Sequence, residues 1–425
     1  MSRKTFFIVS VLVVLVALMV SCAGPQKATE EPTQPPAGAA PTEPQAAPTE
    51  PQAAPTEPPK VEQQAVPTAQ FVDQKVWETQ LAQWTAKPIN PEAELWEQMI
   101  PPADMVDTSK FKKDPPYHLC FSNASVANTW RVTGWAAMQY EVSLHPEIAE
   151  FSVTDAQEKP EKQISDIEDL LTKNCDILIV SPATTEALTP AVEKAAETGI
   201  PVVVFDRGVK TDKMVTFVTP IGGYAYGKAG ADWLVKEMGG KGNMLVLRVL
   251  PGVDVLEARW AAAREIFLRN PEIKILGVEF TEHDPAKAKS LVLDYLQRYG
   301  QIDGIYADFG GVGVAVFEAF QEFGAPMPPM TAEDYNGWLK VWNQNKDTVR
   351  SIAPTNPTYQ WRTAIIAALK ILKGEPVPKV WSLPMPPITE ENLAEYVRPD
   401  LVDDLFVMCG CLYPEVIEKN NFATK

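Results

Sequence analysis

Two polar residues with complementary chemistry follow one of the most apolar runs in the chain. The run Ile200–Phe205 leads directly into Asp206 and Arg207. An aspartate accepts hydroxyl hydrogens, and an arginine presents a fork of donors, so together they can grip neighbouring hydroxyl groups. The same two side chains could instead pair only with each other, as a salt bridge at a strand end. The sequence leaves both interpretations open.

Other apolar runs also end in polar side chains. Trp130, nine residues past Phe121, could offer a flat apolar face to the C–H side of a sugar, or could be packed in the core. His283 could equally be an exposed loop residue, and Asp308 a turn or cap residue. The polar residues that follow the remaining runs are Ser122, Asn123, Thr154, Asp155, Ser181, Glu282, His283, Asp284 and Asp308.

The chain lacks the motifs of covalent and phosphoryl chemistry. It has no G-x-x-x-x-G-K-[ST] and no G-x-S-x-G, and the glycine-rich stretch 310–316 lacks G-x-G-x-x-G spacing. Cys409 and Cys411 are too few ligands for zinc, and the three histidines lie far apart. We therefore expect no catalytic residue, no metal and no cofactor. A secreted carbohydrate-active enzyme is the alternative from another class, although no spacing supports its paired carboxylates.

The elements that would position these residues alternate between strand-like and helix-like from Tyr117 onward, with a break near Pro220–Gly223. Short apolar runs separated by amphipathic helices predict an α/β fold of two doubly wound parallel-sheet lobes. Ligands bind beyond the carboxyl ends of such strands, so facing lobes would bring the polar residues into one cleft. The predicted strands are 117–121, 148–153, 176–180, 201–205, 214–219, 243–249, 273–280 and 302–307, and the predicted helices are 129–144, 161–173, 186–198, 223–238, 255–269, 285–299 and 312–323.

Composition narrows the classes of partner. The formal net charge of −17 argues against nucleic acid, which needs a basic face. Export would permit disulfides, but no pairing follows from the spacing of the cysteines. Because Cys120 and Cys175 lie in or beside apolar strands, buried free thiols are expected there.

The N-terminal part reads as targeting and tethering sequence. Arg3 and Lys4 precede 15 apolar or small residues, Phe6–Val20, which are too short for a span of about 20. Residues 1–21 are therefore predicted to be a signal peptide. Met19-Val20-Ser21-Cys22 is similar to a bacterial lipobox, which would make Cys22 the lipidated first residue of the mature protein. The proline-rich stretch 22–69, with its PTEPQAA repeat, predicts an extended tether, and 70–115 predicts a helical lead-in.

Five segments in order carry a family resemblance. The chain resembles the sugar-binding lipoproteins of ABC transporters, in the ribose- and galactofuranose-binding branch of the type 1 periplasmic binding proteins. The resemblance covers about residues 117–375. The segments are SNASVANTWRV (122–132), D-A-Q-x-x-P-E-K-Q-I (155–164), ILIVSPATTEAL (177–188), IPVVVFDRG (200–208) and AEDYNGW (332–338).

The resemblance implies a set of ligand contacts. Ala262 and Ala263 replace the Gly-Phe that follows the family's second-lobe arginine, which weakens the match at Arg259, and Asp308-Phe309 replaces an Asn-Asp pair. Glu333 is a one-residue alternative to Asp334. Matched position by position, the implied contacts are Asn128, Trp130, Arg131, Asp206, Arg207, Arg259, His283, Asp284, Asp308, Asp334 and Asn356.

The resemblance also implies an architecture and a role. A hinge of three segments would cross between the lobes near 220, 355 and 380. Lobe 1 would comprise 116–219 plus 355–378, and lobe 2 would comprise 220–354 plus 379–425 with a C-terminal wrap.

The expected protein is a monomer, lipid-anchored outside the cytoplasm on a bacterial cell membrane, that delivers a small sugar or polyol to an ABC permease. A receptor of the same fold that signals to a membrane kinase or chemoreceptor is the alternative. A neutral sugar and a sugar acid both remain open as ligands.

Overall fold

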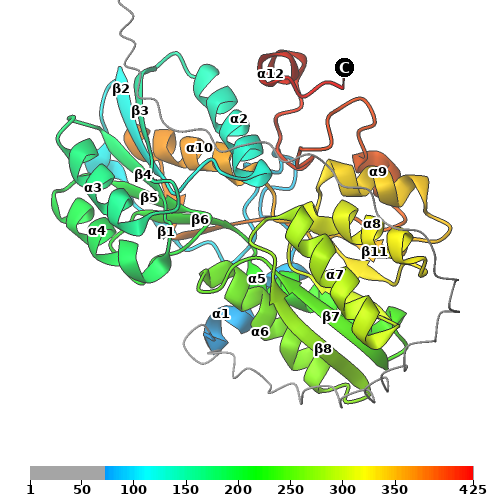
Figure 1. Ribbon diagram of the computed structural model, residues 1–425. Coiled ribbons are helices and arrows are strands. Elements are labelled where there is room, and N and C mark those ends of the chain that lie inside the picture. The colour runs from blue at the N-terminus through cyan, green and yellow to red at the C-terminus, as the bar shows by residue number, and fades with distance from the viewer. Residues whose placement is uncertain (1–71, 425) are drawn as a thin grey trace, which may run out of the picture. The chain divides into compact units, whose positions relative to one another are not determined.

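The computed structural model describes residues 72–424 (Figure 1). The predicted signal peptide 1–21, the lipidation site Cys22 and the tether 22–69 lie outside the described residues. Among residues 72–424, no helix combines the length and the apolar character needed to cross a membrane.

The first lobe is built on a six-stranded parallel sheet. Its strand order is β13-β6-β5-β4-β2-β3. The strands are β2 (Tyr117–Asn123), β3 (Ile148–Asp155), β4 (Ile177–Ser181), β5 (Val202–Phe205), β6 (Thr216–Pro220) and β13 (Val380–Leu383).

Helices cover both faces of this sheet, which explains why its strands read as continuous apolar runs. On one face, Phe121 of β2 contacts the rings of Trp135 and Trp361. On the other face, Leu178 and Val180 of β4 pack in a second apolar cluster. The first face carries α2 (Thr129–Ser143) and α10 (Gln360–Lys373), and the second carries α3 (Pro160–Leu171) and α4 (Thr185–Glu197).

The second lobe has the same architecture, a parallel sheet covered by helices on both faces. Its sheet has five strands in the order β11-β10-β9-β7-β8. Helices α5 and α6 cover one face and α7 and α8 the other (Figure 1). Helices α5 and α6 approach so closely that a Cβ on Gly227 would lie 2.0 Å from the carbonyl oxygen of Arg259. The elements are α5 (Gly223–Glu237), β7 (Gly242–Arg248), α6 (Asp254–Leu268), β8 (Ile273–Phe280), α7 (Pro285–Tyr299), β9 (Gly304–Ala307), η3 (Gly310–Val312), α8 (Gly313–Phe323), β10 (Met330–Thr331), α9 (Asn336–Gln344) and β11 (Ser351–Ile352).

The predicted fold class is confirmed, but the expected boundary after residue 378 is wrong. Residues 380–383 form β13, which pairs in parallel with β6 of the first sheet. Trp381 and Leu383 of this strand are fully buried, so its place in the first lobe rests on core packing. A four-residue strand next to several prolines has too little periodicity to be recognised from sequence. The C-terminal elements are β12 (Val377–Pro378), α11 (Leu393–Tyr396) and α12 (Pro414–Asn420).

Residues 72–115 pack on the main body and contain one regular α-helix. Helix α1 (Gln74–Trp84) stacks Trp77 on Tyr224 of α5, with the ring centroids 4.9 Å apart. The patch AELWEQMI forms turns, in which the carbonyl of Trp96 accepts a hydrogen bond from Thr363. The remaining elements are β1 (Met105–Val106) and η2 (Ser109–Phe111).

The four cysteines among residues 72–424 form two disulfides, so the expectation of free thiols at Cys120 and Cys175 is wrong. Strands β2 and β4 are neighbours in the sheet, which places the Cα atoms of Cys120 and Cys175 5.8 Å apart. That separation is within the range of a disulfide. Cys409 and Cys411 form the second disulfide.

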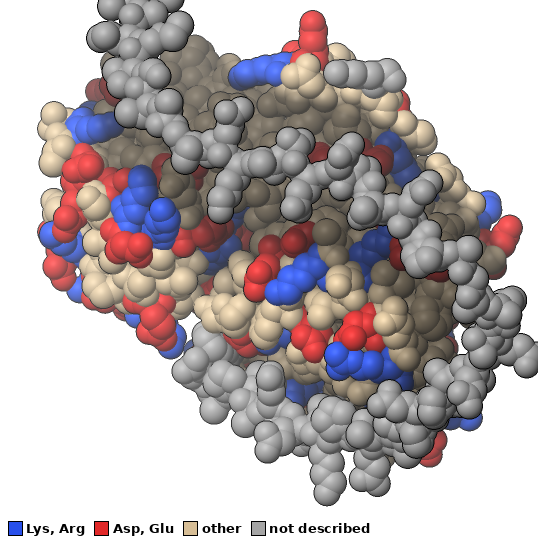
Figure 2. Space-filling view, in the orientation of Figure 1, with Lys and Arg blue, Asp and Glu red and all other residues tan. Residues whose placement is uncertain are grey.

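Charged side chains of both signs lie intermixed on the face of the first lobe drawn in Figure 2. Around α4, Lys194 pairs with Glu168, and Lys213 pairs with Glu197. Exposed ion pairs of this kind contribute about 0–1 kcal/mol each, so these surface charges are a minor part of the stability.

Candidate functional site

A cavity of about 50 Å³ lies between the carboxyl ends of the two sheets. The first lobe lines it with the start of α2 and the two residues after β5. The second lobe lines it with the segment that follows β7 and with residues after β8, β9 and β10. The lining residues are Asn128, Trp130, Arg131, Asp206, Arg207, Val249, Val253, Val255, Leu256, Arg259, His283, Phe309, Glu333 and Asn356.

Arg131 organises the first-lobe wall. Its side chain is 1% exposed, and its Nη2 donates to Asp206 Oδ2 at 2.9 Å. Its Nη1 donates to Asn123 and to Ser181 at the ends of β2 and β4. Burial and the neighbouring Arg207 lower the pKa of Arg131. Asp206 has a left-handed backbone, with φ 67°, and such strain in a non-glycine residue is typical of functional sites.

Asp206 and Arg207 do not pair chiefly with each other. Arg207 Nε lies 4.0 Å from Asp206 Oδ2, whereas Arg207 Nη1 donates to Glu158 Oε2 at 3.0 Å. Glu158 also accepts from Ser125 and lies 3.6 Å from Arg131 Nε. Burial would raise the pKa of Glu158, but Arg207 and Arg131 outweigh it and hold that pKa at about 2.

Glu158 was missed by sequence reasoning. It lies in the loop after β3, three residues beyond Asp155, which the sequence does mark as a strand-end residue. Its backbone is left-handed, with φ 58°, and this turns the carboxylate back toward the two arginines. The signal that could have identified Glu158 is an acidic residue within a few positions of the end of a predicted strand.

The second lobe contains three further buried arginine–carboxylate pairs, one of them between Arg248 Nε and Asp308 Oδ2 at 3.7 Å. Arg259 Nη1 donates to Glu333 Oε1 at 2.8 Å and also to the backbone carbonyl of Asp308. Arg248 at the end of β7 pairs with Glu257 at 3.1 Å. Glu333, the one-residue alternative to Asp334, is thus the residue that reaches the cavity, where it holds Arg259.

Two buried aspartates lie behind this wall. Asp308 is 0% exposed, and neither of its carboxylate oxygens has a hydrogen-bond partner among residues 72–424. Burial raises its pKa to about 7 in spite of Arg248 and Arg259. Asp334 accepts from the backbone N–H of Met408 at 2.8 Å, and burial raises its pKa to about 7 as well.

His283 faces the first-lobe charges from the second lobe. Its ring lies edge-on to Phe309, with the centroids 4.9 Å apart. Burial, and then the positive charge of Arg207, lower the pKa of His283 to about 4. The imidazole is therefore neutral at neutral pH, and it adds a polar, uncharged group to the cavity wall.

Two hydrogen bonds join segments that line or border the cavity. The backbone N–H of Gly208, just after Arg207, donates to Asp254 Oδ2 of α6 at 2.9 Å. The indole N–H of Trp130 donates to the carbonyl of Asn356 at 2.7 Å, in the segment that returns to the first lobe. The first contact ties the two lobes together, and the second holds Trp130 against the segment that returns to the first lobe.

Eight of the eleven residues expected at the site line the cavity, and three do not. Asp284 is exposed and caps α7 by accepting from the N–H of Ala286. Asp308 and Asp334 are buried behind the wall. Trp130 also contacts Trp361 edge-on, so its core-packing interpretation holds in part. The role of the eight in ligand binding remains a prediction.

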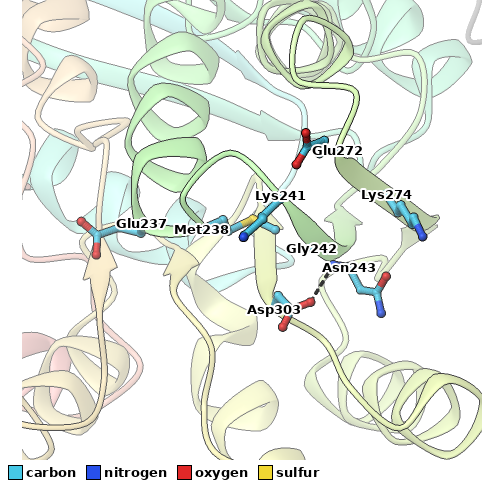
Figure 3. A pocket seen from close by; sticks show the side chains of 8 residues that line it. All are labelled: Glu237, Met238, Lys241, Gly242, Asn243, Glu272, Lys274 and Asp303. Carbon is cyan, nitrogen blue, oxygen red and sulfur yellow. Dashed lines mark hydrogen bonds between the residues drawn. The ribbon is translucent and has the colours of Figure 1, made fainter.

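A larger hollow of about 520 Å³ lies at the other end of the second sheet (Figure 3). Its labelled side chains surround the starts of β7 and β8 and the residue before β9, and Asn243 donates its backbone N–H to Asp303 there. Lys241, Glu272 and Lys274 are exposed to solvent. Ligand sites in doubly wound sheets lie at the carboxyl ends, so the smaller interlobe cavity is the better candidate.

Two doubly wound lobes with a polar cavity between their strand ends form the architecture of a two-lobed binding protein. Residues 119–376 match the family model described as periplasmic binding protein domain, and the chain belongs to this family. It is 25% identical over 241 residues to the ribose import binding protein of Bacillus subtilis (strain 168), covering 55% of this chain and 75% of that protein.

Two further relatives are similarly distant. The xylitol-binding protein of Mycolicibacterium smegmatis is 25% identical over 233 residues, which cover 54% of this chain and 66% of that protein. The crystal structure of an ABC transporter solute binding protein from Thermobispora bispora superposes with a TM-score of 0.61 at 25% identity, covering 68% of this chain and 90% of that chain. The resemblance predicted from sequence motifs is confirmed.

Proposed function

We propose that this protein is the extracytoplasmic solute-binding component of an ABC importer and that it binds a small sugar or polyol between its lobes. The observation that carries the proposal is the interlobe cavity, which is lined by Asp206 and Arg207 together with the aromatic side chains of Trp130 and Phe309. Carboxylate, guanidinium and aromatic groups together suit a ligand with hydroxyl groups on one side and C–H groups on another. The relatives named for ribose and xylitol support the same ligand class.

The charge balance of the site favours a neutral ligand over a sugar acid. Each of the two arginines in the first-lobe wall already has a carboxylate partner, Asp206 or Glu158. In the second lobe, Arg259 is paired with Glu333. An acidic ligand would have to displace one of these buried carboxylates, whereas hydroxyl groups can add to the remaining donor and acceptor sites.

The delivery role rests on hinge motion and on the N-terminal sequence. A ligand that binds one lobe and then gains contacts from the other favours the closed arrangement. The Gly208–Asp254 hydrogen bond is one contact that such closure would form. The lipobox-like Met19–Cys22 and the proline-rich stretch after it would tether the body to the membrane near a permease.

A thermal-unfolding screen against neutral sugars, polyols and the matching sugar acids tests the ligand class. A neutral ligand at a hundredfold excess over its Kd is expected to add about 2.7 kcal/mol, which raises Tm by several degrees. Asp206→Asn should weaken binding of that ligand by at least about 10-fold in calorimetry, because a hydrogen bond to a charged group is lost.

The matched control is Asp212→Asn, a change of the same chemistry at an exposed position of the same lobe. It should leave Kd unchanged. Stabilisation by the sugar acids alone, or by none of the hydroxylated compounds, would contradict the proposal.

A further inference from the structure

The C-terminal residues 397–413, here called the C-terminal strap, are attached to the second lobe by many hydrogen bonds. The side chain of Asn336, at the start of α9, donates to the carbonyls of Arg398, Leu401 and Val402 and accepts from the N–H of Arg398. Its backbone N–H donates to the carbonyl of Leu405. Asn336 is 0% exposed, so one buried amide anchors the strap to the second lobe.

The same strap packs against the first lobe. Leu405 and Cys409 share an apolar cluster with Ala136 and Ala137 of α2. The backbone N–H of Phe406 approaches Thr133 Oγ1 of α2 at 3.3 Å. Beyond the strap, α12 packs beside α2, and in Figure 1 the red chain that precedes α12 lies between α2 and α9.

Met408 is the residue at which the strap passes from one lobe to the other. Its N–H donates to Asp334 Oδ2 of the second lobe, and its carbonyl accepts from the N–H of Tyr359, which precedes α10 of the first lobe. The Cys409–Cys411 disulfide follows at once, and Arg362 of α10 donates to the carbonyl of Gly410 between the two cysteines. The chain therefore crosses between the lobes here, in addition to the crossings near 220 and 355 and the one that follows β13.

We propose that the C-terminal strap positions the two lobes relative to each other and limits how far they open. A wide hinge opening would have to separate Leu405 from Ala136 and Ala137, or pull the strap from Asn336. The strap also supports the cavity wall, because Phe406 packs on Phe309, with the ring centroids 5.9 Å apart. The binding site would thus exchange its ligand through a restricted opening unless the strap is released from one lobe.

Pulsed electron paramagnetic resonance of the ligand-free protein tests this proposal independently of the ligand's identity. Spin labels on Glu161→Cys and Ser290→Cys, both exposed, report the distance between the lobes. With the strap intact, one narrow distance population is expected. Asn336→Ala, which removes the four side-chain hydrogen bonds, should add a longer-distance population.

Two further variants make the outcome decisive. Asn345→Ala is the matched control, because the side chain of this asparagine at the end of α9 bonds only within its own helix, to Val341. Leu405→Ala weakens the contact with α2 while leaving the hydrogen bonds of Asn336 in place, so it serves if Asn336→Ala fails to fold. The proposal is overturned if folded Asn336→Ala or Leu405→Ala protein keeps the narrow distribution, or if the unchanged protein already samples widely separated lobes.

Discussion

Replacing Arg131 with alanine is expected to lower the free energy of unfolding by about 3–5 kcal/mol, because breaking a buried ion pair leaves an uncompensated buried charge. The arginine is 1% exposed and bonds Asp206, which is itself 6% exposed. It also donates to Asn123 and Ser181, so the same substitution leaves acceptors at the ends of two strands without this donor. Such a loss is a large share of the stability of an ordinary domain.

Denaturant unfolding of Arg131→Ala against the unchanged protein measures this effect. The matched control is Arg298→Ala, which removes an exposed arginine paired with Asp294 on α7 and should cost no more than about 1 kcal/mol. Equal and small losses in the two variants would show that the Arg131–Asp206 pair is not a structural support of the first-lobe wall.

Replacing Asp308 with asparagine is expected to make the stability less dependent on pH between about 4 and 7. Burial raises the pKa of Asp308 from 3.8 to about 7, so the folded protein binds a proton here that the unfolded chain releases. The stabilisation associated with this proton is complete below pH 3.8 and is lost as the pH rises toward 7. By linkage the loss amounts to about 4 kcal/mol, and asparagine, which does not ionise, avoids it.

The measurement is the difference in unfolding free energy between Asp308→Asn and the unchanged protein at several pH values. This difference should shift in favour of the variant as the pH rises from 4 to 7, then become constant. Taking the difference between the two proteins cancels the contributions of other groups to the pH dependence. Asp334 loses stabilisation as the pH rises, as Asp308 does. His283 loses stabilisation in the opposite direction, as the pH falls from 6.5 toward 4. Asp347→Asn, at an exposed position, should show a flat difference. A flat difference for Asp308→Asn as well would mean that its carboxylate is stably ionised beside Arg248 and Arg259.

Local patterns predicted most of the fold because burial on both faces of a parallel sheet leaves a direct trace in the sequence. The runs around Leu178 and Val203 are apolar at every position, and both became central strands. Strand β13 left no such trace, since four residues beside prolines are too few to show a period. The sequence predicted a C-terminal wrap on the second lobe but not that the strap also contacts α2 of the first lobe, a contact that depends on segments far apart in the chain.

The position of the candidate site could be predicted from the sequence, but the ion pairs between its side chains could not. Asp206 and Arg207 were found because the residues after a parallel strand always lie at the carboxyl edge of the sheet. Their partners come from elsewhere in the chain, Arg131 from α2 and Glu158 from the loop after β3. In the segment after β10, Glu333 rather than Asp334 reaches the cavity. Neighbouring residues in an extended segment point to opposite sides, and only the register decides which one faces the cavity.

The amino-acid sequence by itself determined the two-lobed α/β class, the edge of each sheet where polar groups gather, and the family. These follow from composition and period, which act over a few residues. Only the tertiary structure decided that Cys120 joins Cys175, that each arginine at the cavity has its own carboxylate, and that the chain crosses between the lobes again at Met408. Those features depend on contacts between segments far apart in the chain, where packing and burial select partners that local patterns do not specify.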